Sequence, residues 1–216
     1  MPDIFDEVAE DLRADRARRL LRRYAGPAAA AGVLLLVGIG GYEGWQRYHA
    51  RDTARVATDY ITAMTVADGP ETGRQGAVPG FEKVAAGTND GYATLARLRL
   101  AALKVDSGDM PAALALWDQI SRDGAADPLL RDLANLRWAT HQIDKGDPAA
   151  VAARLHPLLA PANAWHALAQ EGQALLELRQ GNEAEARDGL KRLAQDVTAP
   201  DGVRGRANGL LSRLGG

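Results

Sequence analysis

The chain has 216 residues, of which 46% are hydrophobic and 25% charged, a composition typical of a folded protein with one or two domains. Its formal net charge of -2 leaves no surplus of Lys and Arg for neutralising phosphates, so we expect no nucleic acid partner. The chain contains no cysteine. This excludes a disulfide scaffold, a thiol nucleophile and a cysteine-ligated zinc site.

Residues 1–24 alternate acidic residues with arginines. Apolar residues recur among them at spacings near three and four, as at Ile4, Val8 and Leu12, and this pattern predicts an amphipathic helix. We interpret residues 1–24 as a solvated segment on the cytoplasmic side of a membrane.

A run of eighteen uncharged residues follows, from Ala25 to Tyr42. A helix needs about 20 residues to cross the hydrocarbon core of a bilayer, so residues 25–48 are predicted to form one transmembrane helix in contact with membrane lipid. Aromatic residues near its two ends are expected to lie at the membrane interfaces. These residues are Tyr24, Trp45 and Tyr48.

The distribution of arginines predicts the orientation of this helix. Six arginines lie before the run, between residues 13 and 23, and three follow it, between residues 47 and 55. The positive-inside rule therefore places the N-terminus in the cytoplasm and residues 49–216 on the other side of the membrane.

Other interpretations of the run stay open. Residues 28–39 have the length of a signal-peptide core, and Gly38-Ile39-Gly40 is a small-x-small site. A retained anchor is favoured because the long segment before them carries six acidic residues among its arginines and no Ala-x-Ala site follows them. A buried core helix is the third interpretation, although such helices rarely stay uncharged for five turns. Gly40 and Gly44 form a small-xxx-small pair suited to packing against another transmembrane helix, so self-association into a homo-oligomer is also left open.

Residues 49–216 open with a predicted helix over residues 50–66, followed by a glycine-rich loop to Gly76. Three similar turns then recur after 38 and 35 residues, each between two amphipathic stretches rich in Ala and Leu. The turns are Ser107-Gly108-Asp109, Lys145-Gly146-Asp147 and Gln180-Gly181-Asn182. Each glycine is expected to end a first helix in the left-handed conformation, and each Asp or Asn to cap a second helix.

Two helices in a period near 34 residues are typical of a tetratricopeptide-like solenoid, so we predict an all-α fold in which residues 49–216 form helical hairpins closed by a helix near Val203–Leu214. Ala113, Ala186 and Trp117 fit the small and bulky packing positions of the second helices. Two registers fit the first helices. One buries Ala101, Ala139 and Ala174, and a shift by one residue buries Leu98, Ala102 and Val105 instead.

The register decides which leucines of the first helices pack inside and which line the concave surface as a partner-binding groove. The candidate groove residues are Leu95, Leu98, Leu133, Leu136, Leu168 and Leu175. Three tryptophans, Trp117, Trp138 and Trp165, fall one in each unit and are expected mainly to fill gaps between stacked units.

Several features follow one another in a recognisable order along the chain. They are a short charged N-terminus, a transmembrane helix ending in Gly44-Trp45-Gln46-Arg47-Tyr48, a helix with an aromatic at Tyr60, the helix start Tyr92-Ala93-Thr94-Leu95-Ala96, and divergent repeats to the end. This order resembles the YfgM-like family of ancillary subunits of the bacterial Sec translocon. The resemblance implies an inner-membrane protein with a periplasmic repeat domain. It also implies contacts with the translocon channel subunits and a membrane-anchored periplasmic prolyl isomerase, and a role with chaperones in handling exported polypeptides.

No sequence pattern points to catalysis. No two histidines have the i,i+4 spacing around a glutamate that a zinc hydrolase needs, and the chain has no phosphate-binding glycine loop and no Gly-x-Ser-x-Gly elbow. We expect no catalytic residue, no cofactor, no metal and no small-molecule substrate. The catalytic alternative is a small metal-dependent enzyme that uses His156 and His166.

The repeats and the lack of a catalytic pattern favour a non-enzymatic protein-interaction subunit. The resemblance implies that this subunit belongs to the bacterial inner membrane and is accessory to the Sec translocon. An alternative within the binding class is a scaffold for envelope assembly or cell division, which uses the same kind of repeat domain.

Overall fold

The computed structural model describes residues 34–39, 41–43, 45–46, 51–87 and 90–215. The chain divides into two compact units, Met1–Arg55 and Val56–Gly216. All described residues of the first unit are helical.

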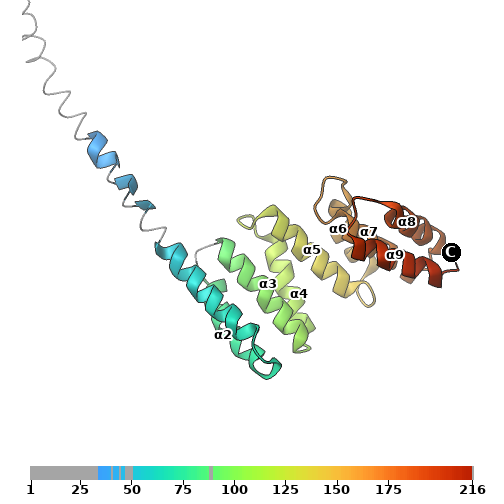
Figure 1. The fold of residues 1–216 in the computed structure, drawn as a ribbon, viewed down its shortest axis with the longest axis horizontal. Coiled ribbons are helices and arrows are strands. Elements are labelled where there is room, and N and C mark those ends of the chain that lie inside the picture. Colours follow the sequence, from blue (N-terminus) through green and yellow to red (C-terminus); the bar gives the residue numbers. More distant parts are fainter. Residues whose placement is uncertain (1–33, 40, 44, 47–50, 88–89, 216) are drawn as a thin grey trace, which may run out of the picture. The chain divides into compact units, whose positions relative to one another are not determined.

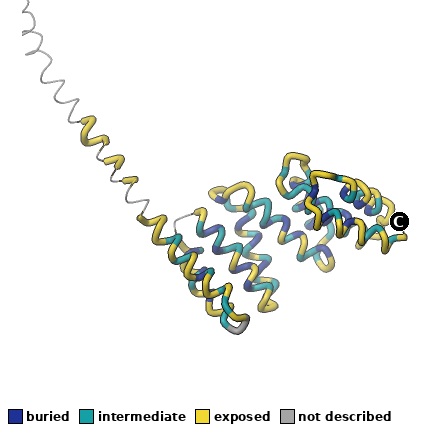
Figure 2. The backbone as a smooth tube through the Cα atoms, viewed as in Figure 1, coloured by how far each residue is buried: buried dark blue, intermediate teal, exposed yellow. Residues whose placement is uncertain are grey.

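Large apolar side chains of the first unit are exposed, as Figure 2 shows for the whole described segment. Their exposed fractions run from 58% to 72% in Leu34, Leu35, Leu36, Val37, Ile39, Tyr42 and Trp45. Among the described residues, no helix is both long enough and apolar enough to span a bilayer. Residues 25–33 of the predicted transmembrane helix, and the predicted interface residues Tyr24 and Tyr48, lie outside the described part of the chain.

The second unit is built of consecutive helices (Figure 1). Residues 56–67 are helical, and the 3₁₀ helix η1 (Glu71–Ala77) and α2 (Val78–Ala85) follow. Three hairpins come next: α3 (Asp90–Asp106) with α4 (Met110–Arg122), α5 (Pro128–Gln142) with α6 (Pro148–Leu155), and α7 (His166–Gln180) with α8 (Glu183–Gln195). The 3₁₀ helix η2 (His156–Leu159) extends α6, and α9 (Asp201–Arg213) closes the series. The predicted helical-hairpin solenoid and its terminal helix are therefore confirmed.

The region before the first hairpin differs from the prediction. The expected glycine-rich loop to Gly76 is wrong, because these residues form η1, and α2 was not predicted at all. Phe81 and Val84 of α2 are buried, and the ring of Phe81 meets the ring of Tyr60 nearly edge-on with centroids 5.7 Å apart. The buried side chains of α2 share one core cluster with buried side chains of α3. Helix α2, which precedes α3 in the chain, therefore packs on it through apolar contacts.

The three turns end their first helices in two different ways. Gly108 and Gly181 adopt left-handed backbone conformations with φ of 80° and 84°, which glycine tolerates at little cost. Gly146 does not, so the prediction for this turn is wrong. There the Gly146 amide donates to the Gln142 carbonyl oxygen at 2.7 Å, and an added Cβ would lie 2.9 Å from that same oxygen. Close approach of the backbone, rather than a left-handed φ, explains the glycine.

The second helices also differ in their caps. Asp109 accepts a hydrogen bond from the Ala112 amide at 3.3 Å, and Asp147 accepts one from the Ala149 amide at 3.2 Å. Asn182 makes no side-chain cap, contrary to the prediction. Its amide group donates to Glu177 instead.

The structure selects the first of the two registers predicted for the first helices. Ala101 and Ala139 are fully buried and Ala174 is 3% exposed, whereas Ala102 is exposed. Small side chains at these positions let the two helices of a hairpin approach closely. Ala101 shares a core cluster with Ala113 and Trp117, two residues predicted to pack on the second helix. Ala186, predicted to pack in the third hairpin, is fully buried on α8.

Arginines link consecutive elements of the solenoid. Arg97 stands four residues before the buried Ala101, on the same side of α3. It donates to the Ala85 carbonyl and to Asp123, both at 3.1 Å, so its charge is paired although it lies beside the core. Arg154 on α6 lies 4.5 Å from the Trp138 ring centroid. It also bonds to three polar side chains on α4 and α5, namely Ser121, Asn135 and Asp118.

Candidate functional site

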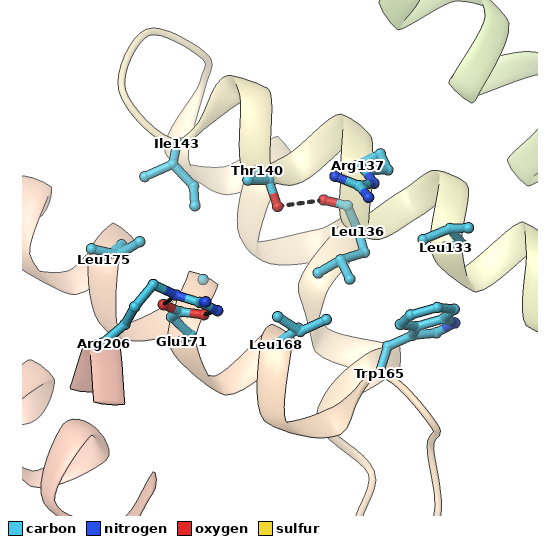
Figure 3. A pocket seen from close by; sticks show the side chains of 11 residues that line it. Leu133, Leu136, Arg137, Thr140, Ile143, Trp165, Leu168, Glu171, Leu175 and Arg206 are labelled. Carbon is cyan, nitrogen blue, oxygen red and sulfur yellow. Dashed lines mark hydrogen bonds and ion pairs between the residues drawn. The ribbon is translucent and has the colours of Figure 1, made fainter. Parts of the chain in front are cut away.

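Two hollows adjoin each other along the first helices of the hairpins. A hollow of about 470 Å³ is lined mainly by α3 and α5, and one of about 450 Å³ mainly by α5 and α7. Leu133 and Arg137 line both hollows. We call the two hollows together the trough. Figure 3 shows the α5–α7 hollow with its leucines and the polar groups at its rim.

All six candidate groove leucines line the trough. Leu95 and Leu98 lie in the α3–α5 hollow, Leu133 lines both, and Leu136, Leu168 and Leu175 lie in the α5–α7 hollow. Leu136 is 5% exposed and the other five are half-buried. Five leucines therefore keep apolar surface that no helix of the described chain covers.

The trough follows from the register, because the same repeat positions line it in each unit. Six residues before the buried alanines Ala101, Ala139 and Ala174 stand Leu95, Leu133 and Leu168. Three residues before these alanines stand Leu98, Leu136 and Glu171. At 3.6 residues per turn, the positions three and six residues before each alanine lie about 60° and about 120° from it around the helix. They therefore lie on the flank of the first helix that lines the hollows, beside the face that packs on the second helix. An apolar row along three consecutive first helices is the result.

Glu171 interrupts this row with a charge that the fold neutralises. Its carboxylate is mostly buried, and Arg206 of α9 donates to it from Nε and Nη2, each at 2.6 Å (Figure 3). Hydrogen bonding to Glu171 raises the pKa of Arg206 above its ordinary value. Sequence analysis missed this pair, because its members are 35 residues apart and no local pattern links them.

Arg137 is exposed where the two hollows meet. Within the described part of the chain it forms no ion pair and no side-chain hydrogen bond. Nearby, His141 stacks on Trp117 with ring centroids 5.0 Å apart. Desolvation, and secondly the charge of Arg137, lower the pKa of His141. The centre of the trough therefore combines apolar walls with a positive charge.

The three tryptophans divide between core and trough. Trp117 is 3% exposed and forms part of the floor of the α3–α5 hollow. Trp138 is half-buried under Arg154, outside the trough. Trp165 lines the α5–α7 hollow, and its Nε1 donates to the Leu129 carbonyl at 3.0 Å, which fixes the ring at the trough wall.

His156 and His166, the residues of the catalytic alternative, stand at the starts of two different helices. His156 opens η2 and His166 opens α7. Neither belongs to a group of three or more potential metal ligands in the described part of the chain.

A solenoid of helical hairpins with an open apolar trough along its first helices defines the chain as a helical-repeat protein of the protein-interaction class. Residues 18–202 match the model of a family described as the tetratricopeptide repeat-like domain. The chain is 32% identical over 193 residues to the ancillary SecYEG translocon subunit of Escherichia coli (strain K12), an alignment that covers 85% of this chain and 88% of that protein. No solved structure matches the chain significantly. The chain belongs to the tetratricopeptide repeat-like family of ancillary SecYEG translocon subunits, which confirms the resemblance drawn from its sequence.

Proposed function

We propose that this protein is a non-enzymatic, membrane-anchored accessory subunit of the Sec translocon, and that its trough binds segments of other proteins during export. The observation that carries the proposal is the row of half-buried leucines along α3, α5 and α7. Apolar side chains that remain accessible along a solenoid are suited to contacts with a partner segment. Binding of this kind needs no covalent step.

In this proposal residues 25–48 form the membrane anchor, with residues 1–24 in the cytoplasm and residues 49–216 in the periplasm. Support comes from the exposed apolar side chains between Leu34 and Trp45, which would be covered by lipid. The distribution of arginines supports the direction of insertion. In this arrangement Tyr24, Trp45 and Tyr48 lie at the two membrane interfaces.

The proposed partners are the channel subunits of the translocon and a membrane-anchored periplasmic prolyl isomerase. The name of the Escherichia coli relative supports the channel subunits as partners. The isomerase is proposed as a partner from the family resemblance alone. In the proposal the anchor lies beside the channel, and the repeat domain handles clients together with periplasmic chaperones.

Sidedness can be tested directly, because the chain has no cysteine of its own. Two single-cysteine variants, Ala14→Cys and Asp188→Cys, would be treated with a membrane-impermeant maleimide on intact spheroplasts. We expect labelling of Asp188→Cys only, with Ala14→Cys labelled after lysis. Labelling of Ala14→Cys on intact spheroplasts would contradict the proposed orientation.

The translocon partnership is tested by photo-crosslinking in cells from position 45, followed by purification in mild detergent. We expect channel subunits in the crosslinked product. A crosslinker at Asp188, an exposed residue on α8, serves as the matched control. Recovery of only division or outer-membrane assembly proteins from position 45 would favour the alternative of an envelope scaffold and contradict the proposed function.

A further inference from the structure

Each unit of the solenoid brings a guanidinium group to the trough. Arg99 and Arg137 each stand two residues before the buried alanine of their helix, Ala101 and Ala139. The equivalent residue of the third unit is Gly172, and there Arg206 of α9 reaches the lining instead. A row of positive groups therefore accompanies the row of leucines, although the whole chain has a formal net charge of -2.

The three arginines differ in the acidic residues that surround them. Arg206 is bonded twice to Glu171. Arg99 shares its hollow with an acidic lining residue, Asp106 of the same helix. Arg137 lines both hollows, with Asp106 in the lining of the α3–α5 hollow and Glu171 in that of the α5–α7 hollow. The Glu171 carboxylate already binds Arg206. Within the described part of the chain Arg137 forms no ion pair and no side-chain hydrogen bond, and it is the arginine that lines both hollows.

The surroundings of Arg137 favour an ion pair with a partner. Apolar walls on both sides, formed by Leu133 and Leu168 among others, would exclude water around a bound segment. An arginine binds a carboxylate with two parallel hydrogen bonds, and this contact strengthens as water leaves. His141, whose pKa is lowered, offers no competing positive charge near neutral pH.

We infer that the trough selects amphipathic protein segments that carry an acidic side chain within their apolar stripe, and that Arg137 is the residue that recognises the carboxylate. The inference rests on the proposed function of the trough and adds the chemistry of its ligand. In the bound state the apolar stripe lies on the half-buried Leu133, Leu168 and Leu175, and the carboxylate lies at the junction of the two hollows. A polyanion such as a nucleic acid is a poorer fit, because its contacts need several cations that converge without apolar walls.

The test uses the full-length chain in lipid nanodiscs and three fluorescent amphipathic peptides of about 16 residues, about 24 Å long when helical. The peptides share leucines at i, i+4, i+7 and i+11 and differ only at one central position, which is Glu, Gln or Lys. Affinities are measured by fluorescence anisotropy. The Glu peptide is expected to bind about fivefold tighter than the Gln peptide, as for a partly exposed ion pair.

Charge reversal at the trough identifies the responsible residue. In Arg137→Glu the preference is expected to switch to the Lys peptide, and in Arg137→Gln it is expected to disappear without switching. The matched control is Arg192→Glu, which makes the same charge change at an exposed residue of α8 outside the trough. The control should keep the preference for Glu. Unchanged circular dichroism spectra would show that each variant is folded.

Several outcomes would overturn the inference. Equal affinities of the Glu and Gln peptides for the unaltered chain would exclude recognition of a carboxylate while leaving apolar binding in the trough intact. A preference for Glu that survives in Arg137→Glu would place recognition elsewhere. Failure of all three peptides, together with a change of oligomeric state in Arg137→Glu, would assign the trough to a second copy of the chain. Failure of all three without such a change would remove both the inference and the proposed use of the trough.

Discussion

Arg206 on α9 and Glu171 on α7 form a two-point ion pair, with Nε–Oε1 and Nη2–Oε2 distances of 2.6 Å each. The pair fixes the closing helix to the wall of the trough. It also neutralises a carboxylate at a repeat position that is leucine in the two other hairpins, Leu98 and Leu136.

Removing the arginine should destabilise the domain. We expect Arg206→Ala to lower the free energy of unfolding by about 1–2 kcal/mol, because it leaves the mostly buried Glu171 carboxylate without its partner. The expected loss is smaller than for a fully buried ion pair, because the Arg206 side chain is 54% exposed and solvent screens the interaction. Urea unfolding followed by circular dichroism measures the change. Arg213→Ala, on the same helix at an exposed position, is the matched control and should have little effect.

A double variant tests whether the pair occupies a position that suits a leucine. Glu171→Leu combined with Arg206→Ala restores the residue type of the other two hairpins and removes both charges. We expect its stability to equal or exceed that of the unaltered chain, because replacing an ion pair with apolar packing is often neutral or favourable. A double variant less stable than Arg206→Ala alone would mean that leucine does not fit at this position.

Adjacent alanines on α3 distinguish the two registers. Ala101→Leu should destabilise the domain by about 1–3 kcal/mol, because Ala101 is fully buried in the hairpin core and a larger side chain overpacks it. Ala102→Leu adds the same atoms at an exposed position of the trough lining and should change stability little. Equal losses in the two variants, measured by thermal unfolding, would contradict the register.

The contrast between the hairpins and their register shows what the sequence could predict. Glycine and aspartate at recurring turns, with amphipathic stretches between them, specified the hairpins because these signals are local. The register was left open because Leu98, Ala101 and Ala102 are all apolar, and only packing against the second helix separates them. The trough was likewise predicted only in part. Its leucines were named from the sequence, but only the register of the first helices shows that they line one surface.

Other features could not be predicted because they depend on contacts between distant residues. The Glu171–Arg206 pair joins two helices that no local pattern connects. The cap at Asn182 failed because its side chain bonds to Glu177 instead. Helix α2 follows the predicted loop and was not predicted, although Val78, Phe81 and Val84 recur every three residues. Eight residues that contain Pro79 and Gly80 give only a weak helix signal.

Two glycine substitutions should act in opposite directions. Gly181→Ala is expected to lower the free energy of unfolding by about 1 kcal/mol, because its φ of 84° is unfavourable for alanine. Gly205→Ala should raise it by about 0.5–1 kcal/mol, because Gly205 lies inside α9 with open space around the position of a Cβ. Urea unfolding measures both. A stabilised Gly181→Ala variant would refute the strained turn.

The stability of the domain should depend on pH through His141. Its folded-state pKa is lowered from the ordinary value of 6.5, so the unfolded chain binds a proton more readily. The neutral His141 side chain therefore contributes to the free energy of unfolding. Its contribution is present in full above pH 6.5 and is lost as the pH falls through the folded-state pKa of His141. We expect the urea midpoint to fall between about pH 7.5 and about pH 5.5, and to fall less in His141→Gln. Identical pH dependence in the two proteins would contradict this assignment.

The most direct test of the trough is photo-crosslinking in living cells from both faces of the solenoid. Crosslinkers at Leu98, Leu133 and Leu168 report on the trough, with one position in each hairpin. The matched controls lie on the second helices, at the exposed residues Ala115, Ala153 and Asp188. We expect partner or client polypeptides attached to the trough positions and little attachment to the controls. Equal attachment at both sets of positions, or attachment at the controls alone, would contradict the trough as the binding surface of this protein.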